Sequence, residues 1–193
     1  MFDNIRKYRI ILASNSPRRR ELLAGLGIDY EVYTLQGVDE SYPSDLPVEQ
    51  IAEYIAAEKA AAYQKQMAVD ELIITADTIV VVDGEVMGKP HDADDARRML
   101  HKLSNRTHQV ITGVSITTTE KQRRFSVITD VTFKSLTNEE IDYYITNYRP
   151  VDKAGAYGIQ EWIGYIGVTG LNGSYFNVMG LPVQRIYTEL CNF

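Results

Sequence analysis

The chain has 193 residues, a formal net charge of −6 and a single cysteine. This length suits one domain, or two small lobes, around a core that needs no disulfide or metal. The acidic balance argues against a general DNA- or RNA-binding protein, and Cys191 alone excludes internal disulfides and a cysteine-rich zinc module. No signal segment and no apolar run of about 18 residues occur, so we expect a soluble cytoplasmic protein without a membrane partner.

The hydrophobic pattern predicts a mixed α/β fold. Short β-branched runs indicate strands, and apolar positions three or four residues apart indicate helices. We expect strands at 8–13, 72–76, 78–82, 108–118 and 125–136, and helices at 17–26, 47–66, 92–103, 137–149 and after residue 182. Ser16 and Gly27 fit the two caps of the first helix, and Asp83-Gly84 fits a hairpin turn. No linker or repeat interrupts residues 1–193, which we take as one domain.

Three arginines, Arg18, Arg19 and Arg20, occupy the predicted first turn of a helix. Acidic side chains would be favoured there, because the helix dipole is positive at that end. A strand, a tight turn and a cationic helix start together make an anion site that suits phosphate groups. Successive helical residues diverge by about 100°, so we expect two of the three guanidiniums to reach one ligand. The alternative is a solvated basic turn, or pairing with Glu21 and other acids.

Lys59 falls in the middle of the apolar face of the second predicted helix, seven residues after Ala52 and four after Ile55. A buried ammonium without a partner is costly. The side chain must therefore either reach an anion or extend along the apolar surface to solvent.

Asp77 interrupts an otherwise apolar extended run, between Ala76 and Thr78. A carboxylate at a strand end lies where α/β folds place ligand chemistry. Such a carboxylate can bind Mg²⁺ or take a proton from water. The alternative is a turn aspartate satisfied by nearby backbone N–H groups.

Other candidates are weaker on their own. Asp39 and Glu40 are adjacent loop carboxylates that suit a hard cation or a solvated turn, and Lys89 follows the hairpin in a rigid turn. The histidines lack zinc-ligand spacing, and neither a P-loop nor a GxSxG elbow occurs. Together, the cations, the carboxylate of Asp77 and the glycine turns indicate a nucleotide or phosphate-ester enzyme that uses Mg²⁺ and an activated water.

Seven motifs in order resemble the Maf family of nucleoside triphosphate pyrophosphatases over nearly the whole chain. They are ASNSPRRRELL (13–23), Glu58-Lys59, ADT (76–78), GKP (88–90), TGV (112–114), DKAGAYGIQ (152–160) and NGSYFNVMGLP (172–182). The resemblance implies an elongated α/β structure around a mixed sheet, with flanking helices and two lobes around a central cleft, similar to inosine triphosphate pyrophosphatases. It also implies cleavage of a nucleoside triphosphate between the α- and β-phosphates, giving the monophosphate and pyrophosphate.

The resemblance implies a role for each matching residue. Asp77 would be the proton acceptor that activates water, and Asp39, Glu40 and Asp77 would be ligands of a divalent cation, Mg²⁺ or Mn²⁺. The residues expected to hold phosphates are Ser14, Arg18, Arg19, Lys59 and Lys89. The AYGIQ ending resembles the branch that acts on dTTP and UTP, in which Arg18, Thr78 and Gln160 would help choose the base.

Two functions remain as alternatives. The first is a non-catalytic nucleotide-binding regulator of cell division. The intact Asp77 carboxylate argues against it, because pure binding of a polyphosphate gains nothing from an added negative charge. The second is nucleotidyl transfer to an acceptor, which would need a pocket that sequence does not reveal. The family habit suggests a homodimer, and no nucleic-acid polymer is expected as a partner.

Overall fold

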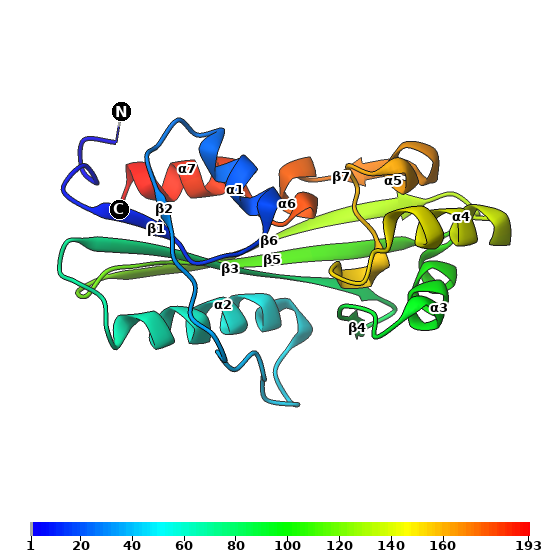
Figure 1. Ribbon diagram of the computed structural model, residues 1–193, viewed down its shortest axis with the longest axis horizontal. Coiled ribbons are helices and arrows are strands. Elements are labelled where there is room, and N and C mark those ends of the chain that lie inside the picture. The colour runs from blue at the N-terminus through cyan, green and yellow to red at the C-terminus, as the bar shows by residue number, and fades with distance from the viewer. Residues whose placement is uncertain (1) are drawn as a thin grey trace. The chain divides into compact units, whose positions relative to one another are not determined.

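The computed structural model describes residues 2–193 and confirms a mixed α/β fold (Figure 1). The strands are β1 (Arg9–Leu12), β2 (Glu31–Val32), β3 (Glu71–Val82), β4 (Glu85–Met87), β5 (Thr107–Thr117), β6 (Gln122–Phe133) and β7 (Val168–Asn172). The helices are α1 (Pro17–Ala24), α2 (Val48–Gln64), α3 (Ala93–Leu103), α4 (Asn138–Tyr148), the 3₁₀ turn η1 (Ala154–Ala156), α5 (Trp162–Gly167), α6 (Tyr175–Met179) and α7 (Val183–Cys191). Within the described residues, the seven-stranded sheet has the order β2-β1-β3-β5-β6-β7, and β4 pairs with β3.

The chain divides into two compact units. Unit 1 contains the described residues up to Asp77, together with Thr112–Val127 and Gly180–Phe193. Unit 2 contains Thr78–Ile111 and Ile128–Met179. Strands β3, β5 and β6 therefore contribute residues to both units. In the described part of the chain, no helix combines the length and the apolar character needed to cross a membrane.

Unit 1 is built on parallel pairing at one side of the sheet. β1 pairs in parallel with β2 and with β3, and Leu12 lies opposite Ile74 of β3. Helix α2 covers one face of these strands, while α1 and α7 lie on the other face (Figure 1). The hydroxyl of Thr75 donates to the backbone carbonyl of Ala56 in α2 at 2.6 Å. This contact fixes α2 against β3 next to Asp77.

Unit 2 has its own apolar core, in which α3 contacts both α4 and η1. The predicted hairpin between β3 and β4 is confirmed, and Val82 lies opposite Glu85. Asp83 and Gly84 have φ angles of 51° and 77°. Two successive positive φ angles define the turn type that best matches the twist of a two-residue hairpin.

The predicted N-cap of the first helix is confirmed. The Ser16 side chain accepts from the backbone N–H of Arg19 at the start of α1, and Thr137 forms a capping box with Glu140 at the start of α4. The prediction that Gly27 caps α1 is wrong. Helix α1 ends at Ala24 with Gly25 as its cap, and Gly27, at φ 67°, turns the chain two residues later.

Buried His108 in unit 2 predicts a loss of stability in acid. Its Nε2 lies 2.7 Å from the Tyr157 hydroxyl, its ring packs edge-on against Phe133, and its Nδ1 has no hydrogen-bond partner within residues 2–193. Burial lowers the pKa of His108 from 6.5 to about 4. The unfolded chain therefore takes up a proton between these two pH values while the folded chain does not, and stability falls as pH falls through this window.

The size of this acid effect can be measured by urea unfolding at pH 7 and pH 4.5. The shift in the His108 pKa corresponds to a change of roughly 3 kcal/mol in the free energy of unfolding between a pH above the unfolded pKa and a pH below the folded pKa. His108→Gln should flatten this dependence, whereas His101→Gln, at an exposed position, should leave it unchanged. Equal pH dependence in the wild type and His108→Gln would contradict the assignment.

Candidate active site

Asp77 lies inside β3 rather than at a strand end, so the predicted break at this residue is wrong. On one side, the pairing with β1 stops at Ile74, where the N–H of Ala13 donates to the Ile74 carbonyl at 2.9 Å. Asp77 follows three residues later, beyond the part of β3 that β1 covers. Its side chain is 16% exposed, which gives a carboxylate that is largely removed from solvent and still reachable.

Lys59 reaches anions, which is the first of the two alternatives that its place on the apolar face of α2 left open. Its ammonium lies 2.8 Å from Oδ1 of Asp77 and 2.9 Å from Oε1 of Glu40, and its side chain is only 14% exposed. Partial burial strengthens the attraction between Lys59 and Asp77, because the local dielectric is lower than in water, whereas Glu40 is 56% exposed and its attraction is screened more. Lys59 therefore joins α2, β3 and the acidic loop that contains Glu40.

The arginines of the first helical turn have different surroundings. Arg19 donates through Nε to the Gly180 carbonyl and through Nη1 to the Ala76 carbonyl, each at 2.8 Å. Burial lowers the pKa of Arg19, Asp77 opposes that shift, and the charge of Arg18 adds to it. Arg20 bonds to the carbonyl of Ser14 at 3.5 Å and to Asn15 at 3.1 Å, which holds the turn before α1. The like-charged neighbours Arg18 and Arg19 form a locally cationic helix start.

Two further predicted residues make local contacts. The Ser14 hydroxyl oxygen accepts from the N–H of Ser16 at 3.2 Å. The Asp39 carboxylate accepts from the backbone N–H and the hydroxyl of Ser41, each at 2.8 Å, and these bonds hold the pKa of Asp39 below its usual value. Within residues 2–193, no three His, Cys, Asp or Glu side chains gather as a metal-binding group. The structure brings Glu40 and Asp77 to Lys59, whereas Asp39 bonds to Ser41.

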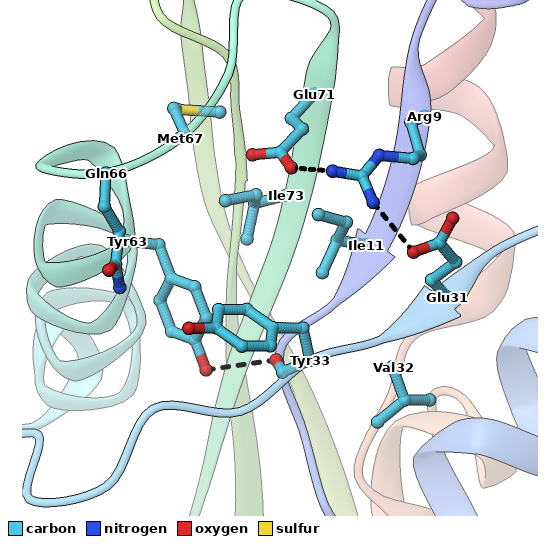
Figure 2. Close-up of a pocket in the computed structure, with 10 residues that line it drawn as sticks. All are labelled: Arg9, Ile11, Glu31, Val32, Tyr33, Tyr63, Gln66, Met67, Glu71 and Ile73. Atoms are coloured by element: carbon cyan, nitrogen blue, oxygen red, sulfur yellow. Dashed lines mark hydrogen bonds and ion pairs between the residues drawn. The ribbon is translucent and has the colours of Figure 1, made fainter.

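A cavity of about 350 Å³ in unit 1 lies near the beginning of β1 and β3 (Figure 2). Arg9 bridges Glu31 and Glu71 at its rim, and Ile11 and Ile73 also line it. Tyr63 of α2 also lines the cavity, one helical turn after Lys59, and Ile73 lies four residues before Asp77 in β3. Neither Lys59 nor Asp77 lines this cavity.

Tyr63, a residue that the sequence did not point to, anchors the start of the acidic loop. Its hydroxyl accepts from the N–H of Leu35 at 2.9 Å and lies 3.2 Å from the carbonyl of Tyr33, to which it donates; Figure 2 shows the second contact. Tyr63 lies one helical turn after Lys59 on α2. Helix α2 thus holds the loop at two points, through backbone groups and through Glu40.

Three predicted residues belong to unit 2. Thr78 follows Asp77 in β3, and Lys89 is exposed in the turn after β4. Gln160 lies in the turn before α5, and its amide oxygen Oε1 is buried without a hydrogen-bond partner among the described residues. A buried acceptor without a donor costs free energy.

The cluster in unit 1 can bind phosphate and move a proton. Cationic groups of Lys59, Arg18 and Arg19 can attract phosphate oxygens, while Asp77 supplies a carboxylate that can take a proton from water. This cluster contains no serine–histidine or cysteine–histidine pair that could provide a nucleophile. The arrangement therefore fits hydrolysis of a phosphoanhydride by water.

The chain belongs to the Maf family, because the sequence model of the family described as "Maf-like protein" matches residues 9–193. A dTTP/UTP pyrophosphatase of Phocaeicola vulgatus is 70% identical over 190 residues, with 98% of each chain covered. A dTTP/UTP pyrophosphatase of Parabacteroides distasonis is 58% identical over 193 residues, with 100% of each chain covered. The family predicted from the seven motifs is confirmed.

A solved structure supports the fold. A HAM1 protein from Coxiella burnetii matches 96% of this chain and 100% of its own length, with a TM-score of 0.50 and 14% sequence identity. At this identity, the likeness concerns the fold alone. It agrees with a mixed sheet flanked by helices.

Proposed function

We propose that this protein hydrolyses dTTP and UTP to the nucleoside monophosphate and pyrophosphate. The observation that carries the proposal is the position of the Lys59 ammonium between Asp77 and Glu40. These two contacts bring the Lys59 ammonium and the carboxylates of Asp77 and Glu40 together in unit 1. Full-length relatives that bear the name dTTP/UTP pyrophosphatase support the same activity.

Phosphate binding is assigned to the cations and to Ser14. Arg18, Arg19 and Lys59 would balance the charge of the polyphosphate, and Lys89 of unit 2 would add a fourth positive charge. Such charge-assisted hydrogen bonds are about twice as strong as neutral ones. Lys59 would exchange part of its contact with the two carboxylates for phosphate oxygens as the substrate enters.

Asp77 is assigned as the general base. Its carboxylate takes a proton from a water, the water oxygen attacks the α-phosphorus, and the bond to the β-phosphate breaks as pyrophosphate leaves. The cationic groups stabilise the charge that develops on the leaving pyrophosphate. No covalent intermediate is needed, because water is the nucleophile.

A divalent cation fits the oxygen donors of Glu40 and Asp77. Lys59 already places a positive charge between these carboxylates, and Mg²⁺ prefers carboxylate oxygens together with substrate phosphates. Asp39, one residue before Glu40, would complete the set with a change of its Ser41 contacts. When bound, Mg²⁺ or Mn²⁺ would supply charge neutralisation to the polyphosphate.

Base choice is assigned to Gln160, together with Arg18 and Thr78. Uracil and thymine carry an N3–H donor beside a carbonyl acceptor, which complements the acceptor and donor of one amide group. Cytosine has no N3–H group. The Gln160 side chain is half-buried, and its Oε1 has no hydrogen-bond partner among the described residues, which supports this assignment.

Location, oligomeric state and partners follow from the same family resemblance and from the charge of the chain. We infer a cytoplasmic homodimer in which residues 1–193 of each chain form one catalytic domain, with no nucleic-acid polymer or membrane as partner. The acidic net charge of −6 supports the absence of a nucleic-acid partner.

Product analysis with a panel of nucleoside triphosphates tests the function. The purified protein is incubated with Mg²⁺ and dTTP, UTP, CTP, ATP or GTP, and the products are separated by anion-exchange chromatography. We expect equal amounts of monophosphate and pyrophosphate, with the fastest turnover for dTTP and UTP. Tight binding without turnover would favour the regulator, and pyrophosphate formed only when an acceptor is added would favour nucleotidyl transfer; either result contradicts the proposal.

A further inference from the structure

A cluster of three polar side chains lies in unit 2, apart from the residues assigned above. Tyr144 of α4 is fully buried, Lys153 is 8% exposed, and Glu161 lies just before α5. The Tyr144 hydroxyl donates to Oε2 of Glu161, and the Lys153 ammonium lies 3.2 Å from Oε1. Lys153 also pairs with Asp152 at 2.8 Å. Buried charged groups are unusual unless they are paired, and here each oxygen of Glu161 has a donor.

This cluster encloses the turn that carries Gln160. The N–H of Gly158 donates to the Tyr144 hydroxyl at 3.0 Å, and the N–H of Glu161 donates to the Gly158 carbonyl at 3.0 Å. The Tyr144 hydroxyl therefore links both ends of the turn, at Gly158 and at Glu161. Burial, with the Glu161 carboxylate, raises the pKa of Tyr144, so its hydroxyl remains a donor.

Gly158 shows how closely the cluster surrounds the turn. A Cβ atom at this position would lie 3.0 Å from Cδ of Glu161 and 3.2 Å from Cε of Lys153. Both distances are short for a methyl group in a packed interior. The space between Gly158 and the cluster is therefore too small for a side chain, and the hydrogen bonds resist movement of the turn away from the cluster.

We propose that Tyr144, Lys153 and Glu161 form a polar clamp that positions the Gln160 amide to recognise a pyrimidine with an N3–H group. This inference rests on the proposed function, because the pyrimidine base of the substrate is the group that Gln160 would contact. These three are positioning residues, since they act through the turn at 158–161. A side chain held before binding loses less conformational entropy when its ligand arrives, and this advantage exists only for substrates that Gln160 contacts.

The test compares the kinetics of Tyr144→Phe, Gln160→Ala and the double variant with UTP and with CTP, together with thermal unfolding. Tyr144→Phe should raise KM for UTP about tenfold, with kcat and the CTP parameters little changed. In the Gln160→Ala background, the same change should have no further effect on UTP, because the group that the clamp positions is gone. Tyr148→Phe is the matched control, since the Tyr148 ring stacks on the Tyr144 ring with 5.1 Å between their centroids and Tyr148 is 37% exposed.

Glu161→Gln provides a second variant if Tyr144→Phe does not fold. It keeps an acceptor for the Tyr144 hydroxyl but removes the charge that holds Lys153, and we expect the same selective rise in KM for UTP. Equal losses for UTP and CTP, or additive losses in the double variant, would show that the cluster only supports the fold and would overturn the inference. A wild-type protein that releases no pyrophosphate from UTP would overturn the proposed function and the clamp together.

Discussion

Asp77→Asn should lower kcat for dTTP hydrolysis by roughly 10²- to 10⁴-fold, the usual contribution of a general base. An amide has nearly the same shape as the carboxylate but cannot take a proton from water at neutral pH. Without a divalent cation, nucleotide affinity should stay the same or increase, because the change removes a negative charge near the polyphosphate. Lys59 would keep its ion pair with Glu40 at 2.9 Å. Steady-state pyrophosphate release and calorimetric dTTP binding measure the two effects.

Asp83→Asn is the matched control for this variant. Asp83 lies in the β3–β4 turn, pairs with Arg106 on an exposed surface and has a positive φ that asparagine also tolerates. Its replacement should leave kcat within about twofold of the wild type, since exposed ion pairs contribute little. Wild-type turnover by Asp77→Asn would remove Asp77 from the role of general base.

Gly113→Ala should destabilise unit 1 by about 3 kcal/mol or more, at the upper end of overpacking effects. A Cβ atom at Gly113 in β5 would lie 2.2 Å from the carbonyl carbon of Ala52 and 2.2 Å from the backbone nitrogen of Glu53. Both contacts involve the backbone of α2, so a change of side-chain rotamer cannot relieve them. Helix α2 would have to move away from the sheet, and Lys59 would move with it. Urea unfolding measures the loss.

Gly88→Ala separates this close contact from the general effect of replacing a glycine. Among the described residues, leaving out its two chain neighbours, no atom lies within 4 Å of the Cβ position at Gly88, and the φ of Gly88 is not positive. The free energy of unfolding of the Gly88→Ala variant should therefore differ from that of the wild type by no more than about 0.5 kcal/mol. Similar midpoints for Gly113→Ala and the wild type would contradict the close packing of α2 on β5.

Local sequence patterns predicted much of unit 1. Ser16 before Pro17 marks a helix start, because side-chain capping involves residues only three positions apart. Lys59 in an apolar helical face implies either an anionic partner or a side chain that extends to solvent, because burying a lone ammonium is too costly. The structure supplies Asp77 and Glu40 as that partner. Both inferences use short-range rules that need no knowledge of the tertiary fold.

Long-range features could not be predicted from the sequence. The predicted break at Asp77 was wrong because the signal came from one polar residue, whereas β3 continues through pairing with distant strands. The bonds from Arg19 to the carbonyls of Ala76 and Gly180 depend on segments 57 and 161 residues away. Tyr144 resembles a core tyrosine in sequence, and only the fold places its hydroxyl beside Glu161.

The distribution of charge explains how an acidic protein can bind a polyanion. A net charge of −6 describes the whole chain, whereas attraction over a few ångströms depends on nearby groups. Arg18, Arg19 and Lys59 provide such groups in unit 1, and Arg19 and Lys59 are largely removed from solvent. The acidic composition argues against a nucleic-acid polymer as ligand but not against a nucleotide.

Hydrolysis of dTTP in ¹⁸O-labelled water tests the central claim most directly, because it identifies the phosphorus atom that water attacks. Attack on the α-phosphorus places the label in dTMP and leaves pyrophosphate unlabelled, and this is the result we predict with Mg²⁺ present. Mass spectrometry of both products provides the measurement. Label in pyrophosphate, or formation of dTDP and labelled phosphate, would contradict the mechanism in which Asp77 directs water to the α-phosphorus.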